Sequence, residues 1–431
     1  MNIKLMSATG VFALSLFAIN ADALETVSYG NFSFTPSLEI GAAGLSHKNQ
    51  AFGGRSSFYG YPVAKDGQRL EAYAKYGADF TVPMSDAWSL GAGVSAVSAL
   101  TRGDSDGLGY TPGDPTDTDW ESAFVKVSGK SVFGLDAVEL SYGRQNFAVG
   151  EGFIIAEGHV DQGHEGAYWL GPRKAFDNTA LLKLDLGQVH VDAFHLQTRL
   201  DVDVADYKEK MELNGLNLQY QTTSGAQLGA MFIKVNDDDY APRDGMSVQD
   251  VRMIGLPVPG LKELKVSAEY VHQKNADIEG RAWYAGATYS FTDLLLTPTL
   301  TYRYSEFSRH YDSLLYGYGG DWGTWVQGEI VGEYMLFNLN QKTSTLKLSV
   351  QPAASVYAGV ILYKIDFDQK PEGIEDSAFA TEADIYVDWL PSEHLALGAL
   401  AGIAKPGEGA KQYFGNDKNS AIFQVYATYK F

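Results

Sequence analysis

The chain ends in "AIFQVYATYKF" (421–431), a stretch in which apolar residues occupy alternate positions up to the last one. The apolar positions are Ala421, Phe423, Val425, Ala427, Tyr429 and Phe431. A period of two is typical of a β-strand with one apolar face. The stretch therefore predicts a final strand, either an ordinary edge strand or one whose apolar face is covered by something other than a protein core.

The opposite end of the chain indicates export. Lys4 precedes a short apolar run, "GVFALSLFAI" (10–19), which is followed by the small residues of "ADA" (21–23). These are the three parts of a secretory signal peptide, and we expect cleavage after Ala23. The alternative is a buried N-terminal helix, since the run is shorter than the roughly 20 apolar residues of a spanning helix.

Composition narrows the class of the mature chain. There is no cysteine among the 431 residues, so disulfides and thiolate chemistry are excluded. The formal net charge of −20 argues against nucleic acid as a partner. With 46 Gly, 26 Tyr and 22 Phe but little helical periodicity, the chain reads as an all-β protein.

Alternation recurs along the whole chain and has a consistent polar face. In "EADIYVDWL" (382–390), Ile385 and Val387 alternate with Asp384 and Asp388. Many such segments are near ten residues long, whereas soluble strands average about 5–6. Aromatic residues gather at segment ends, as in the girdles of membrane barrels. Charges at mid-strand could not be buried in a sandwich core, but a water-filled lumen can hold them.

These features predict an all-β fold: a transmembrane antiparallel β-barrel of about 18 strands (16–18). Short turns would face the periplasm and long loops the exterior, and residues 24–431 would form this one domain. The expected strands are 29–42, 67–81, 87–99, 119–129, 135–145, 178–186, 188–199, 211–222, 226–236, 260–273, 280–291, 294–307, 321–337, 343–351, 354–367, 379–390, 393–403 and 419–431. The expected exterior loops are 43–66, 100–118, 146–177, 237–259, 308–320, 368–378 and 404–418.

Several stretches resemble the alginate-export family of Gram-negative outer-membrane barrels. They are "LSYGRQNFAVGEG" (140–152), "YDSLLYGYGGDWGTWVQGEIVGEYMLFN" (311–338), "DIYVDW" (384–389) and the C-terminal strand. The resemblance implies an 18-stranded channel that exports an anionic polysaccharide through a basic lumen. It also implies that Phe423, Tyr429 and Phe431 form a C-terminal signal read by the barrel-assembly machinery.

The predicted lumen is not clearly basic, which departs from that family. The channel-lining candidates are Arg69, Glu71, Lys75, Glu139, Arg144, Lys183, Arg303, Glu329, Glu333, Lys347, Lys364, Asp384 and Asp388. A strongly anion-selective channel needs a clear excess of positive charge in its lumen. Charges of both signs indicate instead an electric field across the lumen and a preference for polar solutes. Arg144 stands out because it lies in a Gly-Arg-Gln motif beside a long loop.

That loop, 146–177, contains the apolar stretches "FII" (153–155) and "AYWL" (167–170), which are unusual in a solvated loop. One interpretation is a constriction that folds into the pore. The equal alternative is a surface loop that packs on other loops. The candidate constriction residues are Glu151, His159, Asp161 and Arg173.

No metal site, cofactor or catalytic site is predicted. His159, Asp161, His164 and Glu165 match no zinc spacing, and "DSDG" (104–107) lacks the distal glutamate of a calcium loop. His310 borders a serine, but there is no Gly-x-Ser-x-Gly motif. An outer-membrane enzyme and a purely structural barrel remain the minor alternatives.

The function expected from the sequence is diffusion of polar or anionic solutes through a channel in the outer membrane of a Gram-negative bacterium, after Sec-type export. Export of a polysaccharide follows from the family resemblance. Substrate-selective uptake of small organic solutes is the competing hypothesis. The expected partners are outer-membrane lipid and lipopolysaccharide, the assembly machinery and the diffusing solute or polysaccharide.

Overall fold

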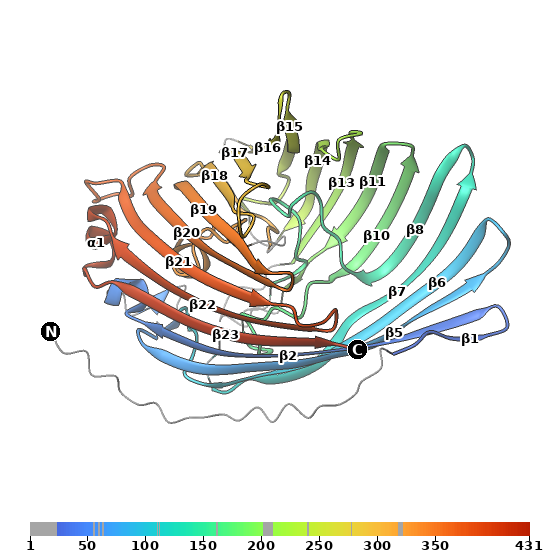
Figure 1. The fold of residues 1–431 in the computed structure, drawn as a ribbon, viewed down its shortest axis with the longest axis horizontal. Helices are drawn as coiled ribbons and strands as arrows, with labels where there is room; N and C mark the ends of the chain where they lie inside the picture. Colours follow the sequence, from blue (N-terminus) through green and yellow to red (C-terminus); the bar gives the residue numbers. More distant parts are fainter. Residues whose placement is uncertain are drawn as a thin grey trace.

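The computed structural model describes residues 24–431, apart from 55–56, 59–60, 63, 110, 112, 161–162, 201–209, 239–240, 277 and 318–321. The predicted signal peptide, residues 1–23, lies outside the described residues. Within the described part, eighteen long strands form one closed antiparallel β-barrel (Figure 1). The predicted fold class is therefore confirmed.

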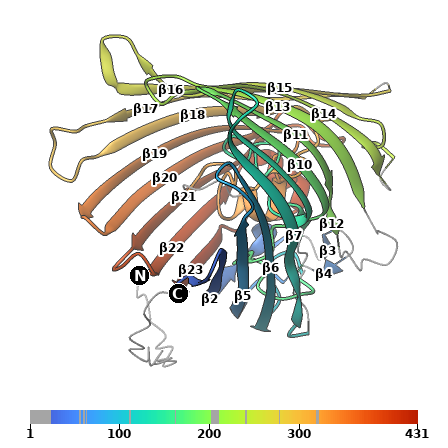
Figure 2. The same cartoon turned by 90° about the vertical axis from the view of Figure 1, so that its right-hand side faces the viewer.

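Consecutive long strands pair with one another, and the last pairs with the first to close the barrel. The long strands are β2 (Phe32–Lys48), β5 (Gly67–Pro83), β6 (Trp88–Gly103), β7 (Thr116–Val132), β8 (Leu135–Gln145), β10 (Phe176–Leu186), β11 (Val189–Gln197), β13 (Met211–Gln221), β14 (Gln227–Asp238), β15 (Ser247–Val258), β16 (Leu261–Asn275), β17 (Ile278–Ser290), β18 (Thr299–Phe307), β19 (Gln341–Ala353), β20 (Val356–Phe367), β21 (Ala378–Trp389), β22 (Leu395–Pro406) and β23 (Ser420–Lys430). Figure 2 shows them following one another around the barrel.

The remaining elements are short. They are β1 (Val27–Tyr29), which pairs with β2; β3 (Ser57–Phe58) and β4 (Tyr61–Pro62), which form a hairpin; β9 (His159–Val160) and β12 (Arg199–Leu200), which pair with each other; the helical turns η1 (Gln50–Gly53) and η2 (Gly332–Leu336); and α1 (Glu408–Phe414). No helix of the described residues is long and apolar enough to cross a membrane.

Many strands present an apolar outer face and a polar inner face, as alternation predicts, whereas on β14 the inward residues Met231, Ile233 and Val235 are apolar and buried. On β21, Ile385 is 58% exposed, whereas the neighbouring Asp384 is only 1% exposed. On the C-terminal strand, Phe423 and Val425 are exposed on the outside, while Gln424 is buried inside. The apolar face of the opening stretch is thus the outer surface of a barrel.

The expected number of strands is right because two errors cancel. Residues 247–258 form β15, although the sequence prediction placed them in the loop 237–259. Residues 321–337 were predicted as a strand, but the described residues from 322 onward form turns and η2 inside the barrel. Alternation is obscured in β15, since its inner face carries the apolar Val248 next to the charged Asp250 and its outer face carries the polar Gln249.

Candidate channel lumen

The described parts of two long connections fold into the barrel, and we call them inner loop 1 (residues 146–160 and 163–175) and inner loop 2 (residues 308–317 and 322–340). Their backbones are joined by the N–H of Ala156, which donates to the carbonyl of Leu315 at 2.8 Å. The N–H of Leu315 donates in turn to the carbonyl of Ile154 at 3.1 Å. The two loops therefore form one hydrogen-bonded unit within the lumen.

The apolar "FII" stretch fastens inner loop 1 to the barrel wall. Phe153 is 1% exposed, and its ring lies 4.6 Å from that of Trp325 in inner loop 2. It also lies 5.4 Å from Tyr284 on β17 and 5.7 Å from Phe307 on β18. These residues are buried against strands and the other loop instead of being solvated.

Of the constriction candidates, His159 and Arg173 are buried inside inner loop 1. Arg173 Nε lies 2.8 Å from Glu165, and His159 Nε2 lies 3.3 Å from the same carboxylate. Glu151 is the candidate that lines a cavity, and Asp161 lies outside the described residues. Arg173 and His159 therefore shape the loop without lining either of the cavities described below.

Carboxylates of β21 hold inner loop 2 in place. Glu382 is 3% exposed and accepts the backbone N–H groups of Ile330 at 2.8 Å and Val331 at 2.9 Å. Asp388 accepts the indole N–H of Trp322 at 2.8 Å. Both are inner-face residues that bind the loop instead of lining open space.

Two cations of neighbouring strands bind the same loop. Arg303 on β18 donates to the carbonyl of Thr324 at 2.6 Å, and its guanidinium lies 4.6 Å from the centre of the Trp325 ring. Lys347 on β19 donates to the carbonyl of Trp322 at 3.0 Å. Charged inner-face residues on at least three strands thus anchor inner loop 2 through its backbone.

Glu329 and Glu333 belong to inner loop 2 itself and not to a strand, which corrects their predicted placement. Burial raises the pKa of Glu333 to about 8, and the charge of Glu157 adds to the increase. Burial also raises the pKa of Glu329 well above its usual range, with further contributions from Asp384 and Glu333. The docked loop therefore favours protonated carboxyl groups.

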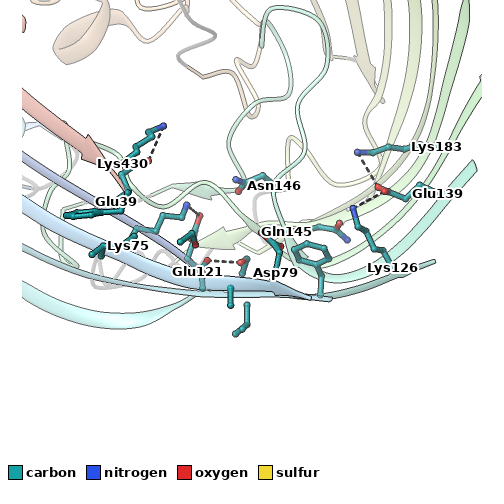
Figure 3. A pocket seen from close by; sticks show the side chains of 18 residues that line it. Glu39, Lys75, Asp79, Glu121, Lys126, Glu139, Gln145, Asn146, Lys183 and Lys430 are labelled. Atoms are coloured by element: carbon teal, nitrogen blue, oxygen red, sulfur yellow. Dashed lines mark hydrogen bonds and ion pairs between the residues drawn. The ribbon is translucent and has the colours of Figure 1, made fainter. Parts of the chain in front are cut away.

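Beside inner loop 1 the barrel contains two cavities, which we call cavity 1 and cavity 2. Their volumes are about 550 Å³ and about 600 Å³. Asn146 and Lys183 line both, so the two cavities adjoin at these residues. The charged residues lining cavity 1 are Glu39, Lys75, Asp79, Glu121, Lys126, Glu139, Lys183 and Lys430 (Figure 3).

Two lysines approach one carboxylate where the cavities meet. Lys126 Nζ lies 3.1 Å and Lys183 Nζ 3.9 Å from Glu139 (Figure 3). One carboxylate cannot neutralise two ammonium groups, so a positive charge remains in excess at this point. Each of the three side chains is about a third exposed, which leaves them in contact with the cavity.

Elsewhere in cavity 1 two lysines each pair with a carboxylate, and Asp79 adds one further carboxylate. Lys75 lies 3.4 Å from Glu121, and Lys430 lies 3.1 Å from Glu39. Glu121 also accepts the backbone N–H groups of Lys174 and Ala175 at the end of inner loop 1. The excess positive charge is therefore local to the junction of the cavities, since the lining of cavity 1 as a whole has four lysines and four Asp or Glu side chains.

The predicted channel-lining residues that lie inside the barrel form two groups: those that line a cavity and those that hold an inner loop. Lys75, Glu139 and Lys183 line a cavity. The side chains inside the barrel that contact an inner loop or pair with such a residue are Arg69, Glu71, Arg303, Lys347, Asp384 and Asp388.

The prediction that Arg144 and Lys364 line the channel is wrong, because the structure places both on the outer face. Arg144 shares a face of β8 with the exposed Leu140 and Tyr142 and pairs with Asp177 at 2.7 Å. It is five residues from the inward Glu139, an odd spacing that reverses the face. Lys364 is exposed and alternates with the buried residues on either side of it in β20.

Sequence reasoning missed Lys126, Gln145 and Asn146, which line cavity 1. A signal for Lys126 was present, because it alternates with Val125 and Val127 in a predicted strand. Asn146 carried none, since its position depends on how inner loop 1 leaves β8. No group of three acidic, histidine or cysteine side chains suited to a metal occurs among the described residues.

Comparisons with known proteins bear on the class of this barrel. No family model matches the chain, and no curated protein matches it either. Among solved structures it is similar to a BenF-like porin from Pseudomonas fluorescens Pf-5, with a TM-score of 0.60 and 10% identity over 92% of this chain and 98% of that one.

Two further structures are similar, both from Pseudomonas aeruginosa. OccK5 (OpdH) has a TM-score of 0.59 and 11% identity over 92% of this chain and 98% of that one. OpdQ has a TM-score of 0.58 and 11% identity over 92% and 97%. Identities this low show the fold alone: a closed 18-strand barrel of the outer-membrane porin kind. They do not show membership of the alginate-export family.

Proposed function

We propose that the protein is an outer-membrane channel through which small organic anions diffuse into the periplasm. The observation that carries this is the excess positive charge of Lys126 and Lys183 around Glu139, where two cavities meet. A positive potential in a narrow aqueous space raises the local concentration of anions. Diffusion through such a site needs no covalent step and no energy input.

The inner loops favour small solutes over a polymer. Together they occupy the lumen next to the cavities, and their contacts with β17, β18 and β21 are buried. The similarity to porins supports uptake more than the polysaccharide export that the family resemblance implied. We place the short turns on the periplasmic side and the long loops outside, as in bacterial barrels generally.

Planar-bilayer recording of the refolded protein in a salt gradient tests the proposal. We expect discrete current steps with anion preference, and Lys183→Gln should lower the anion-to-cation permeability ratio about fivefold. A unit charge about 4 Å away in water is worth about 1 kcal/mol, which corresponds to that factor.

Lys364→Gln is the matched control, since Lys364 lies on the outer face and should not affect selectivity. Cation preference in the wild-type protein would contradict the proposal. So would equal effects of the two substitutions.

A further inference from the structure

The polar side chains that line cavity 2 differ in whether they already make hydrogen bonds or ion pairs within the protein. His190 bonds Asp185 at 2.6 Å and Asp192 at 2.9 Å. Asn217 donates to the other oxygen of Asp192 at 2.8 Å. Lys174 lies 3.0 Å from Glu157. These groups already have partners and have little capacity left for a solute.

Three amide side chains of the same cavity are different. Asn146, Gln219 and Gln227 line it, and within the described part of the chain their amide groups make no hydrogen bond to protein. Gln219 lies on β13 and Gln227 on β14, which are paired strands, so both amides come from one patch of the wall. Each amide offers two N–H donors and a carbonyl acceptor.

The amides line the same cavity as Lys183, the one cation that both cavities share. Lys183 Nζ is 3.9 Å from its nearest carboxylate, beyond hydrogen-bond distance. A carboxylate placed at Lys183 would leave the rest of a small solute in the cavity that the amides line. Inner loop 1 contributes small or apolar residues such as Val149 and Gly150 to the same cavity, together with the charged Glu151 and Lys174.

We infer that cavity 2 is a subsite for hydroxyl groups of the solute, so that the channel prefers hydroxylated organic anions to plain aliphatic ones. The inference rests on the proposed function, since it assigns a substrate class to the same lumen. Amides can both donate to and accept from a hydroxyl, whereas a methylene group would leave them unpaired when it displaces water. The discrimination comes from these neutral groups and is separate from the anion preference set by the lysines.

Adipate and glucarate make a matched pair of probes, because both are six-carbon dicarboxylates and glucarate adds four hydroxyl groups. Each would be added to the full-length refolded protein in a planar bilayer, and the concentration that halves the chloride current would be measured. We expect this concentration to be at least about fivefold lower for glucarate, the factor that one neutral hydrogen bond provides. Equal values for the two anions in the wild-type protein would overturn the inference.

The double variant Gln219→Leu/Gln227→Leu should abolish the difference between the two anions, while Gln369→Leu, in an exposed loop, should preserve it. If the double variant does not assemble, the single variants should each reduce the ratio. A retained ratio in the variants would contradict the subsite.

The reversal potential of the same preparations separates the two proposals. Anion preference without discrimination between adipate and glucarate would leave the proposed function standing and overturn the subsite. Loss of anion preference in the wild-type protein would overturn both.

Discussion

Charged side chains on the inner face of the strands serve two purposes that sequence position does not separate. Lys183 and Glu139 line open cavities, whereas Glu382 and Arg303 bind the backbone of inner loop 2. All four occupy the inner positions of alternating strands. The difference arises from what lies opposite each side chain, which is solvent in one case and a loop in the other.

Arg173 illustrates a residue whose role is internal to a loop. Its side chain is fully buried and pairs with Glu165 at 2.8 Å, and removing one partner of a buried pair leaves the other charge without that counter-charge. We expect Arg173→Met to lower the free energy of unfolding by about 3–5 kcal/mol. Urea unfolding of the refolded protein would measure this.

Arg281→Met is the control for that experiment. Arg281 is 60% exposed and lies 3.5 Å from Glu306 at the surface, so the loss should be about 1 kcal/mol or less. Similar losses for the two variants would show that the Arg173 pair does not stabilise inner loop 1.

At the level of elements, inner loop 2 is the segment whose structure was hardest to predict from the sequence. Its alternating apolar and polar residues predict a strand, yet η2 lies inside the barrel. The backbone N–H groups of Ile330 and Val331, just before η2, are bound by Glu382. Alternation shows only which residues are apolar, and it does not show what surrounds them. A loop surrounded by a barrel wall buries residues on several sides, so its pattern can imitate that of a strand.

The docking of inner loop 2 should depend on pH. The pKa of Glu333 is raised from 4.5 to about 8, and that of Glu329 is also raised, so the docked loop favours the protonated carboxyls. Its stability is fully present below pH about 4.5 and is lost as the pH rises through about 8. We expect current fluctuations from loop movement to be more frequent at pH 9 than at pH 5.

The double variant Glu329→Gln/Glu333→Gln should show the same fluctuations at both pH values, because it cannot ionise at either position. Glu375→Gln, in the exposed loop 368–377, should behave as the wild-type protein does. Wild-type recordings that do not change between pH 5 and pH 9 would refute this prediction.

At the level of the whole molecule, closure depends on one strand. β23 pairs with β22 on one side and with β2 on the other, from Glu39 opposite Lys430 to Lys48 opposite Ala421. The N–H of Phe431 also donates to the carbonyl of Leu38 at 2.9 Å. The last strand in the order of the sequence therefore joins the two ends of the sheet.

The C-terminal aromatic residue should matter for assembly in cells more than for the stability of the finished barrel. We expect Phe431→Ala to reduce the amount of heat-modifiable, assembled protein in the membrane, while refolding in detergent still yields the closed form. Phe133→Ala, in an exposed turn, is the control. Equal cellular yields for both variants would argue against a C-terminal signal at Phe431.

The barrel itself could be predicted because its strands are described by a local rule. Most strands alternate between an apolar outer face and an inner face with polar residues, so positions such as Ile385 and Asp384 can be assigned from their neighbours in the sequence. The predicted number of strands was also correct, because the missed strand β15 was offset by the wrongly predicted strand 321–337. The outward direction of Arg144 could also have been predicted from its odd spacing to Glu139. The Gly-Arg-Gln motif led instead to the wrong prediction that Arg144 faces the lumen.

The amino-acid sequence alone determined the class of fold, the closing strand and the general placement of charges inside the barrel, because these depend on a period of two within single strands. Only the tertiary structure decided which inner charges face open space, how the two inner loops pack together, and that Lys126 and Lys183 share Glu139. Those outcomes depend on contacts between segments far apart in the chain, such as Ile154 with Leu315 and Glu382 with Ile330. No local pattern encodes such contacts, since they form only when the closed wall brings the loops against it.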